Sequence, residues 1–274
     1  MIHQKNGGKT KMNCPRGSNG NVRKKATFIG KSAHAGGAPH LGVNAQYAAM
    51  LGLQAVNDLR ETFQEKDIIR VHPIITAGGK MVNAIPESAV LESFVRGATF
   101  DAICDANRKV NQALCGAALS LGTNVEIIDT PGYAPLINDK NLIEITAKAA
   151  QMAIPEYPLE ITDRILSGST DMGDLSSIMP VVHPYAGGAS GILHGSNFKI
   201  EDPIAACVAS AKMQLGMLLM LLSENGKEAK RVIEEYQPTF ASKEEFLSFV
   251  DRLNAAGDRI EYGSEESVVQ INIQ

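Results

Sequence analysis

"DIIRVHPIITAGGKMVNAIPESAVLESFVRG", residues 67–97, predicts two antiparallel strands and decides the fold of the first half of the chain. Residues 67–77 and 87–97 are both rich in Val, Ile and Phe and read as strands, and the Gly-Gly-Lys at 78–80 is a turn signal between them. These two strands form a slightly extended hairpin. The segments on either side of it then determine what the hairpin belongs to.

Residues 23–29 alternate as a strand should, and residues 123–129 form another strand before the break at Pro131-Gly132. Two sets of apolar residues at helical spacing lie between the strands: Tyr47, Ala48, Leu51, Ala55 and Leu59 in the first, and Ile103, Ala106, Val110, Ala113 and Ala117 in the second. The order β-α-β-β-α-β is that of a ferredoxin-like domain, a four-stranded antiparallel sheet with both helices on one face. We place this domain at residues 22–131.

The two faces of the predicted sheet differ in character, because side chains alternate along a strand with a period of two. The face toward the helices takes Ile69, Val71, Ile75, Ala89, Leu91 and Val95, and the opposite face takes Arg70, His72, Glu92, Phe94 and Arg96. The uncovered face therefore carries cations.

After Pro131 the pattern changes to pieces of a three-layer α/β unit, which we place at residues 132–223. A helix is expected over 139–152, strands over 159–166 and 180–186, then a glycine-rich loop and a long helix over 203–222. The last helix approaches membrane length, but Lys212 and Gln214 at its middle favour a buried amphipathic helix over a span. Asp202 is its expected N-cap and Gly226 its stop. Two strands are too few for a sheet covered on both faces, so part of this module is expected to be missing.

Composition limits the remaining possibilities. The chain of 274 residues carries a net charge of −4 and four cysteines, none closely spaced, which predicts a reduced, cytoplasmic protein of two domains without a membrane partner. Residues 1–21 are basic and rich in glycine, and we expect them to form an unplaced, disordered leader. They lack the interleaved aromatic residues of a nucleic-acid-binding segment, so we expect no nucleic-acid partner. These residues contain no apolar run that could serve as the hydrophobic region of a signal peptide. Residues 224–274 form an acidic extension whose Glu pairs are read as solvated helix faces or as disorder.

Four motifs occur in the order found in one known family: "GKSAHAGGAPHLGVNA" (30–45), "RVHPIITAGGKMVNAIPESAVLESFVRG" (70–97), "GSTDMGDLSSIMPVVHPY" (168–185) and "GILHGSNF" (191–198). Over residues 18–223 the chain resembles the zinc-dependent peptidases and amidohydrolases of metallopeptidase family twenty, which includes aminoacylases and carboxypeptidase G. Within it the chain is most similar to the aminobenzoyl-glutamate hydrolase and peptidase-domain-containing-protein-two branch. The resemblance implies a two-zinc catalytic domain interrupted by a ferredoxin-like lid that also forms a homodimer.

The same resemblance assigns roles to four residues. His34 becomes the catalytic lid histidine, which reaches the active site of the partner protomer and stabilises the oxyanion formed on an amide carbonyl. Asn83 and Arg96 become substrate-binding residues that hold a carboxylate, and His194 becomes the last zinc ligand.

Each role has a plainer alternative. A histidine bonded in a polar turn, a solvated arginine and a surface histidine are the ordinary interpretations of His34, Arg96 and His194. Asp171 is read equally well as an acid near the site and as an acid at a helix N-terminus. His183 is expected to be structural, and His40 receives no role.

The sequence also departs from the family. The H-x-D motif, the bridging acid and the Glu-Glu pair with the general base, which precede the lid in the family, are not present. We therefore expect part of a zinc-dependent amidohydrolase or dipeptidase that cleaves the amide bond of an N-acyl amino acid or small dipeptide, where the complete enzyme uses two zinc ions. The alternative is a non-catalytic dimerisation module or a truncated product without activity.

Overall fold

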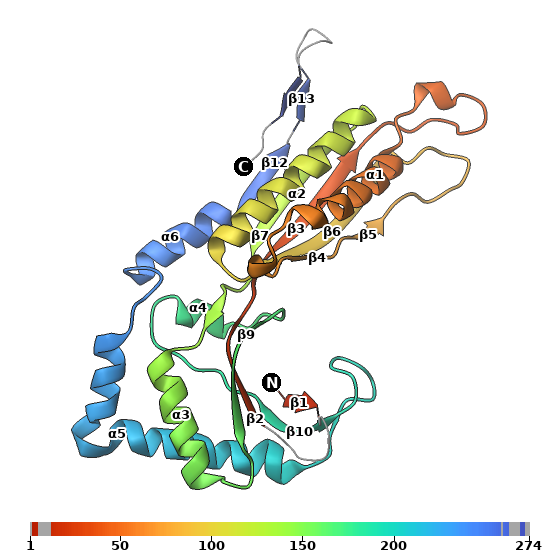
Figure 1. Ribbon diagram of the computed structural model, residues 1–274. Helices are drawn as coiled ribbons and strands as arrows, with labels where there is room; N and C mark the ends of the chain where they lie inside the picture. Colours follow the sequence, from red (N-terminus) through yellow and green to blue (C-terminus); the bar gives the residue numbers. More distant parts are fainter. Residues whose placement is uncertain (1, 5–11, 259, 263–268, 272–274) are drawn as a thin grey trace. The chain divides into compact units, whose positions relative to one another are not determined.

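The computed structural model (Figure 1) describes residues 2–4, 12–258, 260–262 and 269–271. The chain divides into two compact units. Unit 1 combines the described residues up to Ser18 with Pro135–Lys243, and unit 2 combines Asn19–Ala134 with the described residues from Glu244 onward. The chain thus passes from one unit to the other three times.

Unit 2 contains the predicted β-α-β-β-α-β order. Its elements are β3 (Gly20–Ile29), α1 (Ala45–Asp58), β4 (Arg70–Val71), β5 (Ile74–Ala77), β6 (Ser88–Gly97), α2 (Phe100–Ser120) and β7 (Asn124–Pro131). The short helical turns η1 (Pro39–Leu41), η2 (Leu59–Thr62) and η3 (Glu65–Asp67) lie in the connections. The strand order is β12-β7-β3-β6-β4, with β5 also paired to β6. The predicted second strand is therefore divided into β4 and β5, around Pro73, which lacks the N–H that a continuous ladder needs.

Both helices of unit 2 cover the same face of this sheet, as Figure 1 shows. Their contact forms the core, in which Phe28, Leu91, Leu114 and Ile127 are at most 1% exposed. Each helix starts at a side-chain cap: Asn44 accepts a hydrogen bond from the Tyr47 N–H at 3.1 Å, and Thr99 accepts one from the Ala102 N–H at 3.2 Å. Such caps satisfy helix donors that have no partner within the helix.

The C-terminal arm, residues 244–258, adds to unit 2. It comprises all but the first residue of α6 (Lys243–Leu253) and β12 (Ala255–Asp258), which pairs antiparallel with β7. Phe246 is 7% exposed, and the ring of Phe249 packs edge-on against Phe100 with centroids 4.9 Å apart. The arm therefore occupies the β7 edge of the sheet. Beyond it, β13 (Ile260–Tyr262) and β14 (Val269–Ile271) pair with each other.

Unit 1 contains two small sheets. In one, β2 (Met12–Ser18) lies between β8 (Leu136–Ile137), to which it is antiparallel, and β9 (Leu159–Leu166), to which it is parallel. In the other, β10 (Ala186–Ser190) lies between β1 (Ile2–Gln4) and β11 (Lys199–Ile200). The helices are α3 (Lys140–Ala153), α4 (Met172–Ser176), the π-helical turn η4 (Ile204–Ala209) and α5 (Ser210–Glu235).

The expectation that residues 1–21 form a disordered leader is wrong for residues 12–21. Residues 12–18 are the central strand β2, in which Met12 and Cys14 are fully buried, and β3 begins at Gly20. The glycine that suggested disorder is required by packing, because a Cβ on Gly17 would lie 2.0 Å from the Leu136 carbonyl oxygen. Residues 1 and 5–11 lie outside the described residues.

The strand predicted over 180–186 also lies elsewhere. Residues 181–184 are irregular, and β10 runs instead through the glycines at 187 and 188. Gly188 has φ +95°, and a Cβ there would lie 2.5 Å from the Asp202 carbonyl oxygen. The glycines therefore allow the strand to approach the start of η4 closely, where a glycine-rich loop was expected.

The long C-terminal helix begins and breaks where the sequence predicts. The Asp202 carboxylate accepts a hydrogen bond from the Ala205 N–H at 3.0 Å. Within α5 the backbone leaves the helical conformation at residues 223–226, where Glu224, Asn225 and Gly226 have positive φ. A continuous helical run thus covers residues 204–222, followed by a second run that ends at Glu235.

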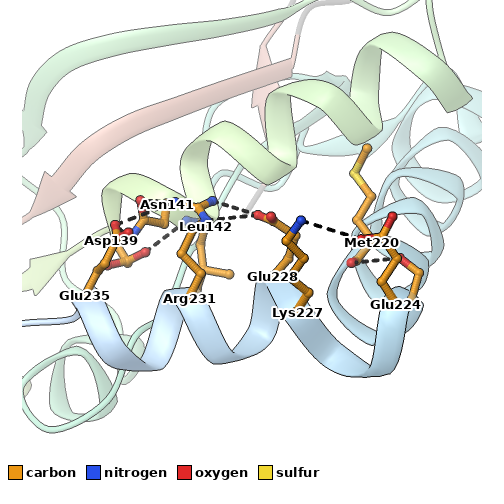
Figure 2. A network of polar contacts seen from close by, with 10 residues as sticks. Asp139, Asn141, Leu142, Met220, Glu224, Lys227, Glu228, Arg231 and Glu235 are labelled. Carbon is orange, nitrogen blue, oxygen red and sulfur yellow. Dashed lines mark hydrogen bonds and ion pairs between the residues drawn. The ribbon is translucent and has the colours of Figure 1, made fainter.

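The second run of α5 is attached to α3 by a polar network (Figure 2). The Arg231 guanidinium donates to Glu228 at 2.8 Å and to the Asn141 side-chain oxygen at 2.8 Å, and Asn141 donates to Glu235 at 3.0 Å. The hydrogen bond from Arg231 lowers the pKa of Glu228 below its usual range. This network fixes the register of the second run on α3.

The first run of α5 leaves an apolar face exposed. Leu215, Leu219 and Leu222 are 60%, 71% and 65% exposed, while Met213 on the opposite side is 2% exposed. Ile204–Glu235 is apolar enough to cross a membrane by length and composition, and 22% of its most apolar stretch is buried. The helix is amphipathic as predicted, but its apolar face is only partly buried within the described residues.

Candidate functional site

Two loops of unit 2 meet beyond the ends of β3 and β6, and they carry His34 and Asn83. The Ala35 N–H donates to the Asn83 carbonyl at 3.0 Å, the Ile85 N–H donates to the Ala33 carbonyl at 2.9 Å, and His34 forms a bridge with Ala84. Residues 30–44 and 78–87 therefore run side by side, which Figure 1 shows at one end of the unit 2 sheet. Residues far apart in the sequence become neighbours through backbone pairing.

His34 is held by its own turn. The imidazole Nδ1 accepts hydrogen bonds from the Gly36 N–H at 3.2 Å and from the Gly37 N–H at 2.8 Å, and the side chain is exposed. Because Nδ1 accepts, the neutral ring carries its proton on Nε2, which is then a donor. The arrangement satisfies the plainer interpretation of a histidine in a polar turn, and it also presents one hydrogen-bond donor to solvent.

A groove of about 610 Å³ lies between the same two loops, a size ordinary for small-molecule sites. The flanking residues Ala35 and Ala84 line it, and its polar groups come from Asn44, Gln46, Tyr47 and Lys80. Its wall contains one cation and no acid, so it favours neutral or anionic groups. The sequence did not predict these four residues as site residues, because none belongs to a motif with a chemical role. They line a common groove only once the two loops pair.

Arg96 lies at the other end of β6. Ile29 pairs with Ser88 at the end near the loops, whereas Arg96 pairs with Asn21. The eight positions from Ser88 to Arg96 span roughly 26 Å at about 3.3 Å per residue. The side chain is half-buried on the uncovered face, with its guanidinium carbon 5.0 Å from the centre of the Phe94 ring. One copy of unit 2 therefore brings His34 and Asn83 together and does not bring Arg96 to them.

The predicted site residues of unit 1 do not form a metal centre. His194 is exposed in a loop, with φ +65°. Asp171 occupies the N-cap position of α4 and its carboxylate accepts a hydrogen bond from Thr170. Among the residues that the structure describes, no group of three His, Cys, Asp or Glu side chains could hold a metal ion. The described residues thus do not fit a catalytic zinc, which takes about three protein ligands.

His183 and His40 have no role that the geometry supports beyond structure. The His183 N–H donates to the Asn138 side-chain oxygen at 2.8 Å, its ring packs edge-on on Tyr185, and burial lowers its pKa. His40 is exposed in the η1 turn.

Sequence reasoning missed a polar cluster inside unit 2. Lys24 is fully buried and donates to both Asp129 and the Asn111 side chain, while Asn107 donates to Asp129 at 2.8 Å. A signal was present, since the period of two that places Ala26 and Phe28 inward also places Lys24 inward. The cluster is enclosed by the core, where each charged group depends on its partners.

Comparison with known proteins gives a family match over most of unit 2. Residues 16–118 match the family model described as the peptidase dimerisation domain of M20. The chain is 33% identical to the mouse Xaa-Arg dipeptidase over 162 residues, which is 58% of this chain and 37% of that protein. It is 29% identical to a p-aminobenzoyl-glutamate hydrolase homolog of Haemophilus influenzae over 126 residues, 43% of this chain and 27% of that protein. The chain spans less than two-fifths of these relatives.

A solved structure shares the fold beyond unit 2. An amidase of the hydantoinase/carbamoylase family from Burkholderia multivorans superimposes with a TM-score of 0.60 at 17% identity, covering 77% of this chain and 50% of that one. The 77% of this chain that superimposes contains more residues than unit 2, so the likeness extends into unit 1. The resemblance inferred from the four motifs is confirmed: residues 16–118 form an M20 peptidase dimerisation domain.

Proposed function

We propose, from the M20 peptidase dimerisation domain that residues 16–118 form, that this chain is the dimerising and substrate-positioning part of an amidohydrolase. Its substrate class is an N-acyl amino acid or a small dipeptide. The observation that carries the proposal is the pairing of the His34 and Asn83 loops beside a groove of small-molecule size. The names of the relatives, a dipeptidase and an aminobenzoyl-glutamate hydrolase, support an amide bond as the target.

The homodimer forms through the β5 edge and the adjoining face of α1. β12 covers the β7 edge, so among the described strands of this sheet the β4–β5 edge is the open one. Exposed apolar side chains lie beside it: Ile74 on β5 is 51% exposed, and Tyr47 and Met50 on α1 are 61% and 52% exposed. An open strand edge next to apolar side chains is suited to pairing with a second copy.

A second copy would also bring Arg96 close to His34 and Asn83, which are far from it within one chain. A small acyl amino acid is far shorter than the distance between Arg96 and the paired loops of one chain. It can contact Arg96 of one protomer and His34 of the other only if the two ends of the domain meet across a dimer. In that arrangement Arg96 binds the carboxylate, Asn83 donates from its amide, and His34 donates from Nε2 to the carbonyl oxygen of the scissile amide.

In a complete enzyme of this type, bound zinc would activate the attacking water. The described residues of this chain do not form its ligand set, so we assign this chain binding and orientation and no metal chemistry. This favours the alternative of a module that is inactive alone. The free state of all four cysteines supports a reducing compartment such as the cytoplasm.

The test measures assembly and turnover on the full chain. Sedimentation should show a dimer, and Ile74→Lys together with Met50→Lys should convert it to a monomer. The wild-type chain with added zinc, cobalt or manganese should not hydrolyse acyl amino acids, aminobenzoyl-glutamate or dipeptides. A wild-type chain that stays monomeric at high concentration would contradict the proposed dimer. Turnover that His194→Ala abolishes would contradict the assignment of a non-catalytic part.

A further inference from the structure

The groove beside the paired loops of unit 2 carries charge of one sign. Lys80 is the only charged residue among the described residues that line it, and its polar neighbours in the lining are Asn44, Gln46 and Tyr47. Lys80 is exposed and takes part in no ion pair among the residues that the structure describes. No carboxylate of this lining offsets its ammonium group, so the groove attracts anions and disfavours a second cation.

The other polar groups of the groove can act as hydrogen-bond donors. The Asn44 side-chain oxygen is engaged as a helix cap, where it accepts from the Tyr47 N–H at 3.1 Å. The Asn44 amide NH₂, the Gln46 amide and the Tyr47 hydroxyl can each donate. The loop that carries Lys80 packs on these residues, since a Cβ on Gly79 would lie 3.5 Å from the Gln46 side-chain oxygen. The lining thus suits a group rich in acceptors, such as a carboxylate.

The acyl group is the part of the substrate that lies nearest to this groove. The proposed function places the carbonyl oxygen of the scissile amide at His34 Nε2, and it directs the carboxylate of the amino-acid part to Arg96 of the other protomer. The acyl group is bonded to the same carbonyl carbon and extends away from the amino-acid part. Ala35 follows His34 directly and Ala84 forms a bridge with it, and both line the groove.

The groove is adjacent to the proposed dimer face and largely separate from it. Tyr47 belongs to both, whereas Ile74 and Met50 of the dimer face are not among the described residues that line the groove. Dimer formation through Ile74 and Met50 therefore does not require the groove.

We propose that the groove receives the acyl group of the substrate and that Lys80 selects the charge of this group. An acyl group that ends in a carboxylate pairs with the Lys80 ammonium, whereas the ammonium group of a dipeptide meets a cation that no acid of the lining offsets. This inference rests on the proposed function. It decides between the two substrate classes named there in favour of N-acyl amino acids, and among these it favours an acidic acyl group.

The experiment uses the full chain and three probes that share a C-terminal glycine: N-succinylglycine, N-butyrylglycine and β-alanylglycine. Their acyl groups have the same length and end in a carboxylate, a methyl group and an ammonium group. In calorimetry at pH 7 the wild type should bind N-succinylglycine about 5-fold more tightly than N-butyrylglycine, the size expected of an exposed ion pair, and should bind β-alanylglycine most weakly.

Two substitutions of Lys80 separate its charge from its bulk. Lys80→Gln should remove the preference for N-succinylglycine, and Lys80→Glu should reverse the order so that β-alanylglycine binds most tightly. Both variants should keep the melting temperature of the wild type, because the side chain is exposed. The same order of affinities in Lys80→Glu as in the wild type would overturn the selection by Lys80.

Lys66→Gln is the matched control, since Lys66 is an exposed cation of η3 outside the described lining of the groove. It should keep the order of the wild type, and loss of the order in this variant would overturn the site in favour of a general charge effect. Equal binding of the three probes by the wild type would overturn the inference and leave the proposed function standing. No binding of any probe by a dimeric wild type would overturn the proposed positioning role and this inference with it.

Discussion

The ammonium group of Lys24 and the carboxylate of Asp129 form an ion pair inside the core of unit 2, where the two side chains are 0% and 3% exposed. The Lys24 ammonium also donates a hydrogen bond to the Asn111 side-chain oxygen, and the Asn107 side-chain amide donates one to the Asp129 carboxylate. Lys24 and Asp129 face each other because β3 and β7 are neighbours and residues 24 and 129 are directly opposite in their register. A pair that is both charged and enclosed is stable only while both partners and their hydrogen bonds are present.

Replacing one partner should therefore be strongly destabilising. Lys24→Met leaves the Asp129 carboxylate buried without its cation, and we expect a loss of about 3–5 kcal/mol in the free energy of unfolding. Urea denaturation at neutral pH measures it. Lys25→Met, the neighbouring lysine on the exposed face, is the control and should have little effect. Similar losses in the two variants would contradict the buried pair.

Removing the C-terminal arm should free the β7 edge. A chain that ends at Ser242 lacks β12 and uncovers the Phe100 ring, so we expect faster amide hydrogen exchange along β7 and larger assemblies in size-exclusion chromatography. A chain that ends at Asp258 retains the arm and is the matched control. If the two truncated chains exchange and elute alike, the arm does not protect this edge.

The exposed face of α5 should bind a hydrophobic dye. Leu215, Leu219 and Leu222 lie on one helix face at spacings of four and three residues. The triple change to Gln should reduce dye fluorescence without lowering stability, because these side chains are already exposed. Met213→Gln, at a buried position of the same helix, should instead destabilise unit 1. A wild-type chain that binds no dye would show that something covers this face.

The cysteines should react at very different rates with a thiol reagent. Cys207 is exposed, whereas Cys14 and Cys115 are buried, and burial raises the pKa of Cys104. At pH 8 we expect one fast reaction that Cys207→Ser abolishes, since the thiolate is the reactive form. A fast phase that survives in Cys207→Ser would contradict this prediction, because it would come from Cys14, Cys104 or Cys115.

Cys14 should make stability depend on pH in the alkaline range. Burial raises its pKa to about 11 from an ordinary value of 9.0. As pH rises, the thiol ionises first in the unfolded chain, which favours unfolding. The contribution of Cys14 to the free energy of unfolding is therefore complete below pH 9 and is lost between pH 9 and 11, a decrease on the order of 2 kcal/mol. Urea midpoints of the wild type and Cys14→Ala between pH 8 and 11 measure it. Parallel pH profiles of the two proteins would contradict the prediction.

The sequence alone determined the order of elements in unit 2, which face of its sheet is covered, and the start and break of the long helix. These features depend on local spacing: a period of two in strands, a period of 3.6 in helices, and caps and breaks such as Asp202 and Gly226. The four motifs likewise indicated the peptidase family, whose dimerisation domain residues 16–118 form.

Only the tertiary structure decided which residues meet. Residues 12–18 became a central strand because their glycine permits close approach to β8, a contact that no local pattern reveals. The pairing of the His34 and Asn83 loops, the separation of Arg96 from them and its position opposite Arg70 all follow from strand register. The periodicity of one strand specifies which face each of its side chains takes. It does not specify which residue of a distant segment stands opposite, because that depends on hydrogen bonds between segments that are far apart in the sequence.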